Sequence, residues 1–281
     1  PINEFDFDVA ILFSDILFPL EALGMDLSYN PGPQFGLHLD EENAGSLLTN
    51  QNPIDFMDFQ GEAIERTIER LPEEKSLIGF VGGPWTLIAY ACNVNKDLSD
   101  ISISNFQVGL LENVILPLLK ENIKLQLNAG AEIVMIFDSA AHQLADEDFK
   151  IYLDKTFNEL AKEFPNKVGY YAKDGINYDI IVDKKNQEGI ALAGMGLDSS
   201  IDLKDYFNQT GNGFIQGNFS ENFLTLPYEQ FLPKLEDFIN HMADLGPDDR
   251  LGWVCGLGHG VLKTTPQENV KAFVTKIREN F

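Results

Sequence analysis

The sequence is poor in cysteine and in basic residues, and both shortages restrict what the protein can be. Only Cys92 and Cys255 occur among 281 residues, too few for a disulfide framework or a four-thiolate metal site, so a reducing cytoplasm is expected. Lys and Arg number 20 against 44 Asp and Glu, which gives a formal net charge of −24. A surface of this sign repels nucleic acid and anionic membranes, so we expect neither as a partner.

Long apolar runs and zinc-ligand spacings are also missing. No apolar run approaches the roughly 18 residues of a membrane-spanning helix, and no basic leader precedes an apolar core. The chain is therefore expected to be soluble and cytoplasmic. Neither His-x-Cys nor Cys-x-x-Cys occurs, so no catalytic zinc site is expected.

Short apolar segments typical of buried strands alternate with segments of helical spacing along the whole chain. The expected strands are 9–13, 77–81, 132–137, 168–172, 190–197, 214–216 and 251–257. The expected helices are 61–71, 86–92, 104–128, 146–160, 202–207, 227–245 and 265–277. This alternation predicts a parallel sheet covered by helices. A closed (β/α)₈ barrel needs eight strands, so the sheet is open or one strand is missing, most simply upstream of Pro1.

Polar or glycine residues follow each expected strand, at the rim where parallel barrels carry active sites. They are Asp15, Gly82, Gly83, Asp138, Ser139, Lys173, Asp174, Asp198, Asn218 and His259. Asp15 suits either a catalytic role or a helix cap, and loop or cap roles are favoured for Asp138 and Asp198. For Lys173 an ion pair is favoured over a Schiff base. His259 stands between glycines and can bind a carboxylate or carbonyl, or simply complete a loop.

Taken together, these motifs resemble those of the uroporphyrinogen decarboxylase family. The first matching segment contains the Phe-Ser-Asp-Ile-Leu that ends at Leu17. Further matching segments follow in the family's order over the rest of the chain. The matching segments are 10–17, 22–25, 78–87 with Tyr90, 136–139, 172–175, 196–198, 216–218, 257–260 and 265–270. The combination is specific, whereas each motif alone is not.

The resemblance implies a single (β/α)₈ barrel domain over residues 1–281, in a homodimer that uses no cofactor or metal. It implies an enzyme, a carboxy-lyase that removes the carboxyl groups from the four acetate side chains of uroporphyrinogen III and yields coproporphyrinogen III. The family's arginine-bearing Met-Arg-Gln-Ala-Gly-Arg-Tyr motif, normally upstream of the first segment, has no match here. The barrel is therefore expected to lack its first strand, and activity without those arginines is left open.

The resemblance also assigns roles to individual residues. Asp15, Tyr90 and His259 match catalytic positions, and together with Ser139 they match positions that bind substrate. Phe80 and Phe137 match residues that pack against the macrocycle; ordinary barrel core is the alternative for both.

The sequence departs from the family pattern at segment 91–96, which replaces a glycine-rich stretch, and at Ser199.

Two other functions remain open. One is a zinc-dependent corrinoid or thiol methyltransferase of the same superfamily, and the other is a non-catalytic barrel that binds tetrapyrroles.

Overall fold

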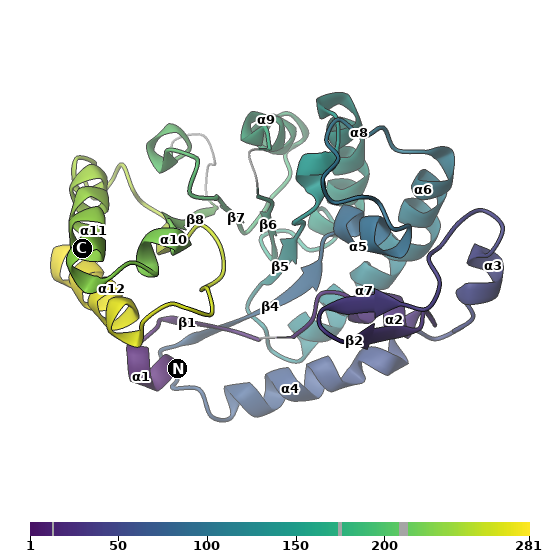
Figure 1. Ribbon diagram of the computed structural model, residues 1–281, viewed down its shortest axis with the longest axis horizontal. Coiled ribbons are helices and arrows are strands. Elements are labelled where there is room, and N and C mark those ends of the chain that lie inside the picture. The colour runs from purple at the N-terminus through teal and green to yellow at the C-terminus, as the bar shows by residue number, and fades with distance from the viewer. Residues whose placement is uncertain (13, 174–175, 208–212) are drawn as a thin grey trace.

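A parallel sheet of seven strands forms the centre of the protein, which is described by a computed structural model for residues 1–12, 14–173, 176–207 and 213–281 (Figure 1). In spatial order the strands are β1 (Val9–Ile11), β4 (Ser76–Gly82), β5 (Val134–Phe137), β6 (Val168–Tyr171), β7 (Gly194–Gly196), β8 (Phe214–Phe219) and β9 (Trp253–Leu257). Every neighbouring pair is parallel. The parallel sheet expected from the alternating pattern, and the α/β barrel class implied by the resemblance, are therefore confirmed.

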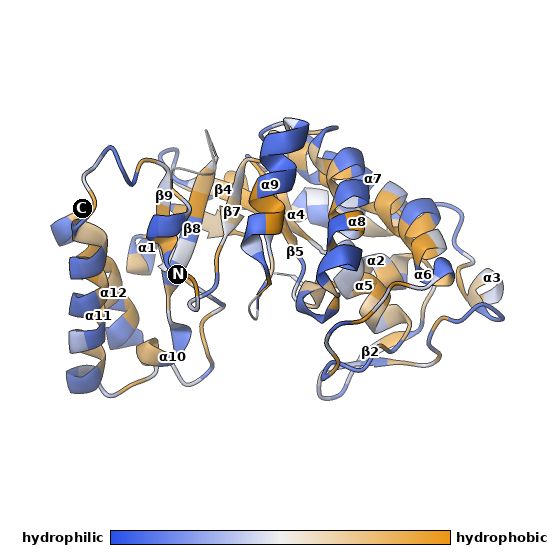
Figure 2. Ribbon diagram, turned by 90° about the horizontal axis from the view of Figure 1, so that it is seen from above, coloured by the Kyte–Doolittle hydropathy of each residue, from blue (hydrophilic) through white to orange (hydrophobic). Residues whose placement is uncertain are grey.

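Helices follow the strands and cover the sheet (Figure 1). They are α1 (Ile2–Phe5), α2 (Phe18–Ala22), α3 (Ala44–Leu47), α4 (Asp58–Ile68), α5 (Pro84–Ala91), α6 (Asn105–Leu110), α7 (Leu116–Asn128), α8 (Asp146–Thr156), α9 (Tyr178–Glu188), α10 (Glu221–Leu224), α11 (Tyr228–Ala243) and α12 (Gln267–Asn280). Hydrophobic residues concentrate in the strands and in the helix faces that meet them, whereas α9 and α11 carry hydrophilic outer turns (Figure 2).

Most expected elements are found, with shifted ends. β7 is shorter than the expected strand 190–197, and β8 extends beyond 214–216. Phe13, at the end of the expected first strand, and Asp174 lie outside the described residues. From the sequence, Asp146 and Thr265 are the expected N-caps of the helices at 146–160 and 265–277. Both expectations were wrong: Ala145 and Pro266 occupy the N-cap positions, because their backbones are the last extended ones before the helix.

Helix α9, the β2–β3 hairpin and the short helices α1, α2, α3 and α10 were not expected. Helix α9 has no clean helical spacing of apolar residues, because Ile180, Ile181 and Val182 are consecutive and all buried. The segment 24–33, expected to be a loop, contributes to an antiparallel hairpin of β2 (Leu27–Tyr29) and β3 (Pro33–Phe35). This hairpin is short and largely exposed, so it leaves no alternating apolar pattern in the sequence.

The two outer strands, β1 and β9, leave the barrel open along one side. They are the two ends of the strand order, and residues from both line a cavity of about 560 Å³ that α12 borders. The terminal helices bridge this side: the Arg278 guanidinium donates to the Asp8 carboxylate at 2.8 Å. In the described part of the chain, the seven strands thus form a curled, open barrel wall.

Gln126 of α7 takes over the hydrogen bonding of β4 where β1 ends. Its Oε1 accepts from the Phe80 N–H at 2.9 Å, and its Nε2 donates to the Phe80 carbonyl at 2.8 Å. Gly79 makes this approach possible, because a Cβ there would lie 2.1 Å from Gln126 Oε1. The buried amide therefore satisfies two buried backbone groups of a central strand.

We predict that Gln126→Leu lowers the free energy of unfolding by about 2–4 kcal/mol, because it leaves the Phe80 N–H and carbonyl buried without partners. Urea denaturation measures this change. Gln187→Leu on the exposed face of α9 is the matched control and should change stability little. Equal losses in the two variants would contradict this assignment.

Candidate functional site

A large cavity lies beside helix α5 and the end of β5, and two residues expected in the site line it. Its volume is about 1120 Å³, and it is lined by Tyr90, on α5, and Ser139, directly after β5. Tyr90 is 41% exposed, and Ser139 is half-buried. Hairpin strand β3 and the segment after α5 complete the wall. We take this cavity as the main part of the candidate active site.

Asp138 fixes the two elements that carry Tyr90 and Ser139. Its Oδ1 accepts from the Thr86 N–H at 3.0 Å and from the Thr86 hydroxyl at 2.8 Å. Its Oδ2 accepts from the hydroxyls of Tyr170, at 2.9 Å, and Tyr152. Asp138 is fully buried, and burial raises the pKa of its carboxyl, against the hydrogen bonds that lower it. The carboxyl thus caps helix α5 from the neighbouring strand, in line with the non-catalytic role favoured for it.

Gly83 is required for this arrangement. A Cβ at Gly83 would lie 2.3 Å from atoms of the Asp138 side chain. The Gly-Pro sequence at 83–84 therefore does two things: it lets the carboxyl approach the helix, and it places proline in the first turn, where no N–H is needed.

Asp15 lies next to this cavity but lines a different one. Its Oδ1 accepts from the Leu17 N–H at 2.8 Å, which turns the chain into α2. The smaller cavity has a volume of about 460 Å³ and is bordered by α4. Ser14 Oγ and Gln60 Oε1, which belong to its lining residues, are buried without a hydrogen-bond partner in the described structure. The next residue, Ile16, lines the large cavity. The structure therefore keeps Asp15 and Tyr90 in adjoining rather than shared cavities.

Tyr29, on the β2–β3 hairpin, links the cavity of Asp15 to that of Tyr90. It was not among the residues that the sequence predicted for the site. Burial raises the pKa of the Tyr29 hydroxyl, and so do the charge and hydrogen bond of Asp15 and the proximity of Tyr90. The Tyr29 hydroxyl thus interacts with the carboxylate assigned the central catalytic role. The one signal in the sequence was the Asn-Pro-Gly turn after Tyr29, which is typical of a tight turn between two strands.

The two phenylalanines lie together inside the curled sheet. The Phe80 and Phe137 ring centroids are 5.5 Å apart, and the Phe137 and Tyr171 centroids are 5.9 Å apart. Phe80 is only 6% exposed, and Phe137 is half-buried. Phe80 thus has the packing of an ordinary core residue, whereas Phe137 retains surface for a ligand.

His259 stands apart from both cavities. Its side chain is exposed, and its Nδ1 lies 3.4 Å from the Gly260 carbonyl. The loop itself is anchored across the barrel, since the Tyr171 hydroxyl donates to the Gly258 carbonyl at 2.8 Å. The structure therefore joins β6 to the loop after β9, but it does not bring His259 into the cavity of Tyr90 and Ser139.

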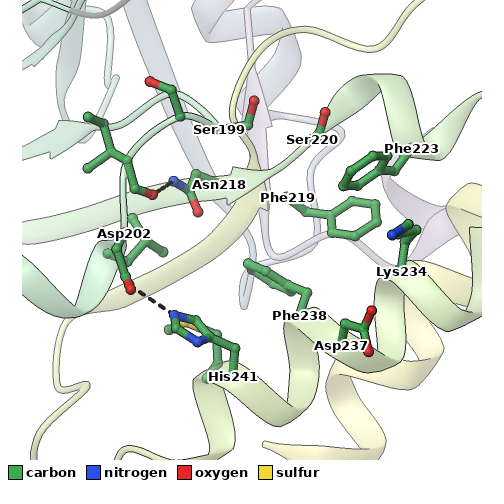
Figure 3. Close-up of a pocket in the computed structure, with 14 residues that line it drawn as sticks. Ser199, Asp202, Asn218, Phe219, Ser220, Phe223, Lys234, Asp237, Phe238 and His241 are labelled. Atoms are coloured by element: carbon green, nitrogen blue, oxygen red, sulfur yellow. Dashed lines mark hydrogen bonds and ion pairs between the residues drawn. The ribbon is translucent and has the colours of Figure 1, made fainter.

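A further cavity, of about 410 Å³, lies between helix α11 and the segments that follow β7 and β8 (Figure 3). Its polar contact joins His241 Nε2 to Asp202 Oδ1 at 2.9 Å, and the two side chains point toward each other in Figure 3. Phe219, Phe223 and Phe238 form its apolar wall. None of the six residues expected in the site lines this cavity.

Among the residues that the structure describes, no group of three or more His, Cys, Asp and Glu side chains is placed to hold a metal ion. In the same part of the chain, no helix has the length and apolar character needed to cross a membrane.

Comparisons with known proteins agree on one family. A family model described as uroporphyrinogen decarboxylase (URO-D) matches residues 1–280. A uroporphyrinogen decarboxylase of Prochlorococcus marinus (strain MIT 9215) is 30% identical over 97% of this chain and 80% of its own length. The chloroplastic uroporphyrinogen decarboxylase 1 of Oryza sativa subsp. japonica is 33% identical over 97% of this chain and 68% of its own length.

Among solved structures, a methyltransferase from Methanosarcina mazei superposes with a TM-score of 0.72 at 19% identity, over 99% of this chain and 82% of that one. At this identity the likeness establishes a shared fold and nothing about the reaction.

We predict that Asp138→Asn lowers the free energy of unfolding by about 1–3 kcal/mol at pH 7, because an amide nitrogen replaces an oxygen that accepts hydrogen bonds. The pKa of Asp138 is higher in the folded protein than its ordinary value of 3.8. The wild-type carboxyl therefore contributes most to the stability of the fold below pH 3.8, and this contribution is lost as the pH rises through the folded-state pKa. The difference between variant and wild type should therefore widen as the pH falls toward 4.

Urea denaturation at several pH values measures this difference, with Asp183→Asn on the exposed face of α9 as the control. A difference that narrows on acidification would refute the raised pKa of Asp138.

Proposed function

The chain belongs to the uroporphyrinogen decarboxylase family, and from this premise we propose that it decarboxylates the four acetate side chains of uroporphyrinogen III to give coproporphyrinogen III in tetrapyrrole synthesis. The observation that carries the proposal is the family match over residues 1–280, which includes Tyr90 and Ser139 in the lining of a cavity of about 1120 Å³. This volume is at the upper end of ordinary ligand pockets.

The proposed reaction needs no external electron acceptor. A proton added to a pyrrole carbon makes the ring cationic, and the ring then accepts the electron pair released when the acetate C–C bond breaks and CO₂ leaves. The side-chain carbon, now an exocyclic methylene, then takes a proton and becomes a methyl group. The ring, cationic again, finally loses the proton that was added first. A carboxylate beside the macrocycle lowers the barrier, because it stabilises the cationic ring.

Asp15 is the carboxylate that we assign to this task. Its interaction with Tyr29 supports the assignment, because a phenolic O–H already occupies a place where pyrrole N–H groups would donate. Substrate N–H groups would replace the Tyr29 hydroxyl, and this exchange would open the smaller cavity of Asp15 toward that of Tyr90. Ile16, which lines the large cavity, lies at the junction.

The remaining site residues take supporting roles in this proposal. Tyr90 and Ser139 would orient the reacting acetate with their hydroxyls, and Phe137, together with Phe80 behind it, would pack against the macrocycle. His259 would bind a substrate carboxylate once its loop turns toward the cavity. We also propose that residues 1–281 act as one domain in a cytoplasmic homodimer, and sedimentation in solution tests the dimer.

A zinc-dependent methyltransferase is the second candidate, favoured by the fold shared with the Methanosarcina mazei methyltransferase. The described residues supply no three-residue ligand group for zinc, so the decarboxylase has the better support. Stoichiometric zinc in the purified protein would favour the methyltransferase.

We predict that the protein forms coproporphyrinogen from uroporphyrinogen, detected by porphyrin fluorescence after oxidation. Asp15→Asn should lower kcat by about 10²-fold or more, because it removes the charge that stabilises the protonated ring. Asp183→Asn is the control with the same chemical change on an exposed helix face. No product from the wild-type chain would overturn the proposed function, and full turnover by Asp15→Asn would overturn the role of Asp15.

A further inference from the structure

The loop after β9 leaves the barrel from a buried glycine. The Gly258 N–H donates to the Phe219 carbonyl at 2.9 Å, and the Gly258 carbonyl accepts from the Tyr171 hydroxyl at 2.8 Å. Gly258 is buried, whereas residues 259–264 are all exposed. Both main-chain polar groups of Gly258 are thus paired, and the exposed part of the loop begins directly after it, at His259.

Tyr171 reaches Gly258 across the interior of the curled sheet. It is the last residue of β6, and β7 and β8 lie between β6 and β9 in the strand order. Its ring packs edge-on against Phe137, with 5.9 Å between the two centroids, and the residue is buried. A hydrogen bond in such surroundings is stronger than one in water. The Tyr171 hydroxyl therefore fixes the point at which the loop leaves β9.

Two further contacts hold the same point. Gln216 Nε2, from β8, donates to the Leu257 carbonyl at 3.2 Å. A Cβ at Gly258 would lie 2.4 Å from the Ser199 nitrogen, so glycine is needed where the loop passes the segment after β7. Side chains from β6 and β8 thus bind two consecutive carbonyls, those of Leu257 and Gly258, just before His259.

His259 is held far less firmly than the residue before it. Its side chain is exposed, and its Nδ1 lies 3.4 Å from the Gly260 carbonyl, which is long for a hydrogen bond. A Cβ at Gly260 would meet no described atom within 4 Å, so the chain beyond His259 has room to turn. Gly258 therefore fixes where His259 starts, while the direction of the imidazole remains adjustable.

We propose that Tyr171 is a positioning residue that acts through His259: its hydroxyl fixes Gly258 and so limits the places from which the imidazole can reach a ligand. The inference rests on the proposed function, in which His259 turns toward the cavity and binds the substrate. If the hydroxyl is missing, the end of β9 has more freedom, and more of it must be ordered when the substrate binds. No role implied by the resemblance falls on Tyr171, which directly precedes the matching segment 172–175.

The substitution Tyr171→Phe tests this role, because the ring stays against Phe137 and only the hydroxyl is lost. It should raise KM for uroporphyrinogen about three- to tenfold, as for the loss of one buried hydrogen bond. It should leave kcat within about twofold, because the added ordering weakens binding of the substrate and of the transition state alike. Tyr228→Phe removes a hydroxyl from an exposed tyrosine of α11 and should leave both parameters unchanged. Urea midpoints show that both variants are folded.

A double-mutant cycle separates positioning of His259 from a general loosening of the barrel. The dissociation constant of uroporphyrin, the oxidised macrocycle, is measured by fluorescence for Tyr171→Phe, His259→Gln and the double variant. Tyr171→Phe should weaken binding when His259 is present, but change it less than about twofold once His259 is replaced. Independent, multiplying effects of the two substitutions would overturn the proposal, and so would an unchanged KM in Tyr171→Phe.

A further measurement depends on neither turnover nor substrate. The chain has four histidines, so protein labelled only at histidine gives four imidazole signals in nuclear magnetic resonance, and His259→Gln identifies that of His259. Tyr171→Phe should shift or broaden this signal and leave that of His241, which lies 2.9 Å from Asp202 Oδ1, unchanged. An unchanged His259 signal would overturn the positioning role even if the protein makes coproporphyrinogen. A changed one would support it even if no coproporphyrinogen forms, in which case only the proposed reaction fails.

Discussion

The buried carboxyl of Asp138 is the constraint on which the rest of the site depends. It accepts from two groups of Thr86 and from two tyrosine hydroxyls, and so it ties β5, β6, α5 and α8 to one point. Tyr90 follows Thr86 by one helical turn, and Ser139 is the next residue after Asp138. The Asp138 carboxyl has no part in the proposed chemistry, but it sets the relative positions of Tyr90 and Ser139, which do take part in it. A buried polar network of this kind is stabilising only while all its members are paired.

Acidic residues are in large excess, and they give the chain a formal net charge of −24. The exposed ion pairs within its helices contribute little to stability. In the wall of the large cavity, His38 and His142 are held by the main-chain carbonyls of Tyr90 and Ser139. A ligand with several carboxylates would meet long-range repulsion as it approaches this protein.

The open side of the barrel is the second structural feature with consequences. β1 and β9 are the outer strands of the described sheet. Contacts between the terminal helices and β1 cover part of this side, among them Arg278 with Asp8. The apolar cavity beneath α12 remains. Asp15 lies just beyond β1, so its surroundings depend on how this edge of the sheet is held.

The sequence by itself determined the fold class, the order of the seven strands and the identity of the family. Buried strands are continuous apolar runs, and helices between them repeat every three to four residues, so both patterns are local and can be read without coordinates. The motifs also located Asp15, Ser139 and His259 after strands, and Tyr90 in the helix that follows the strand at 77–81. Only the tertiary structure decided which of these residues share a cavity, because cavities form between segments distant in sequence. It placed Tyr90 with Ser139, Asp15 against the unexpected hairpin of Tyr29, and His259 on a separate loop.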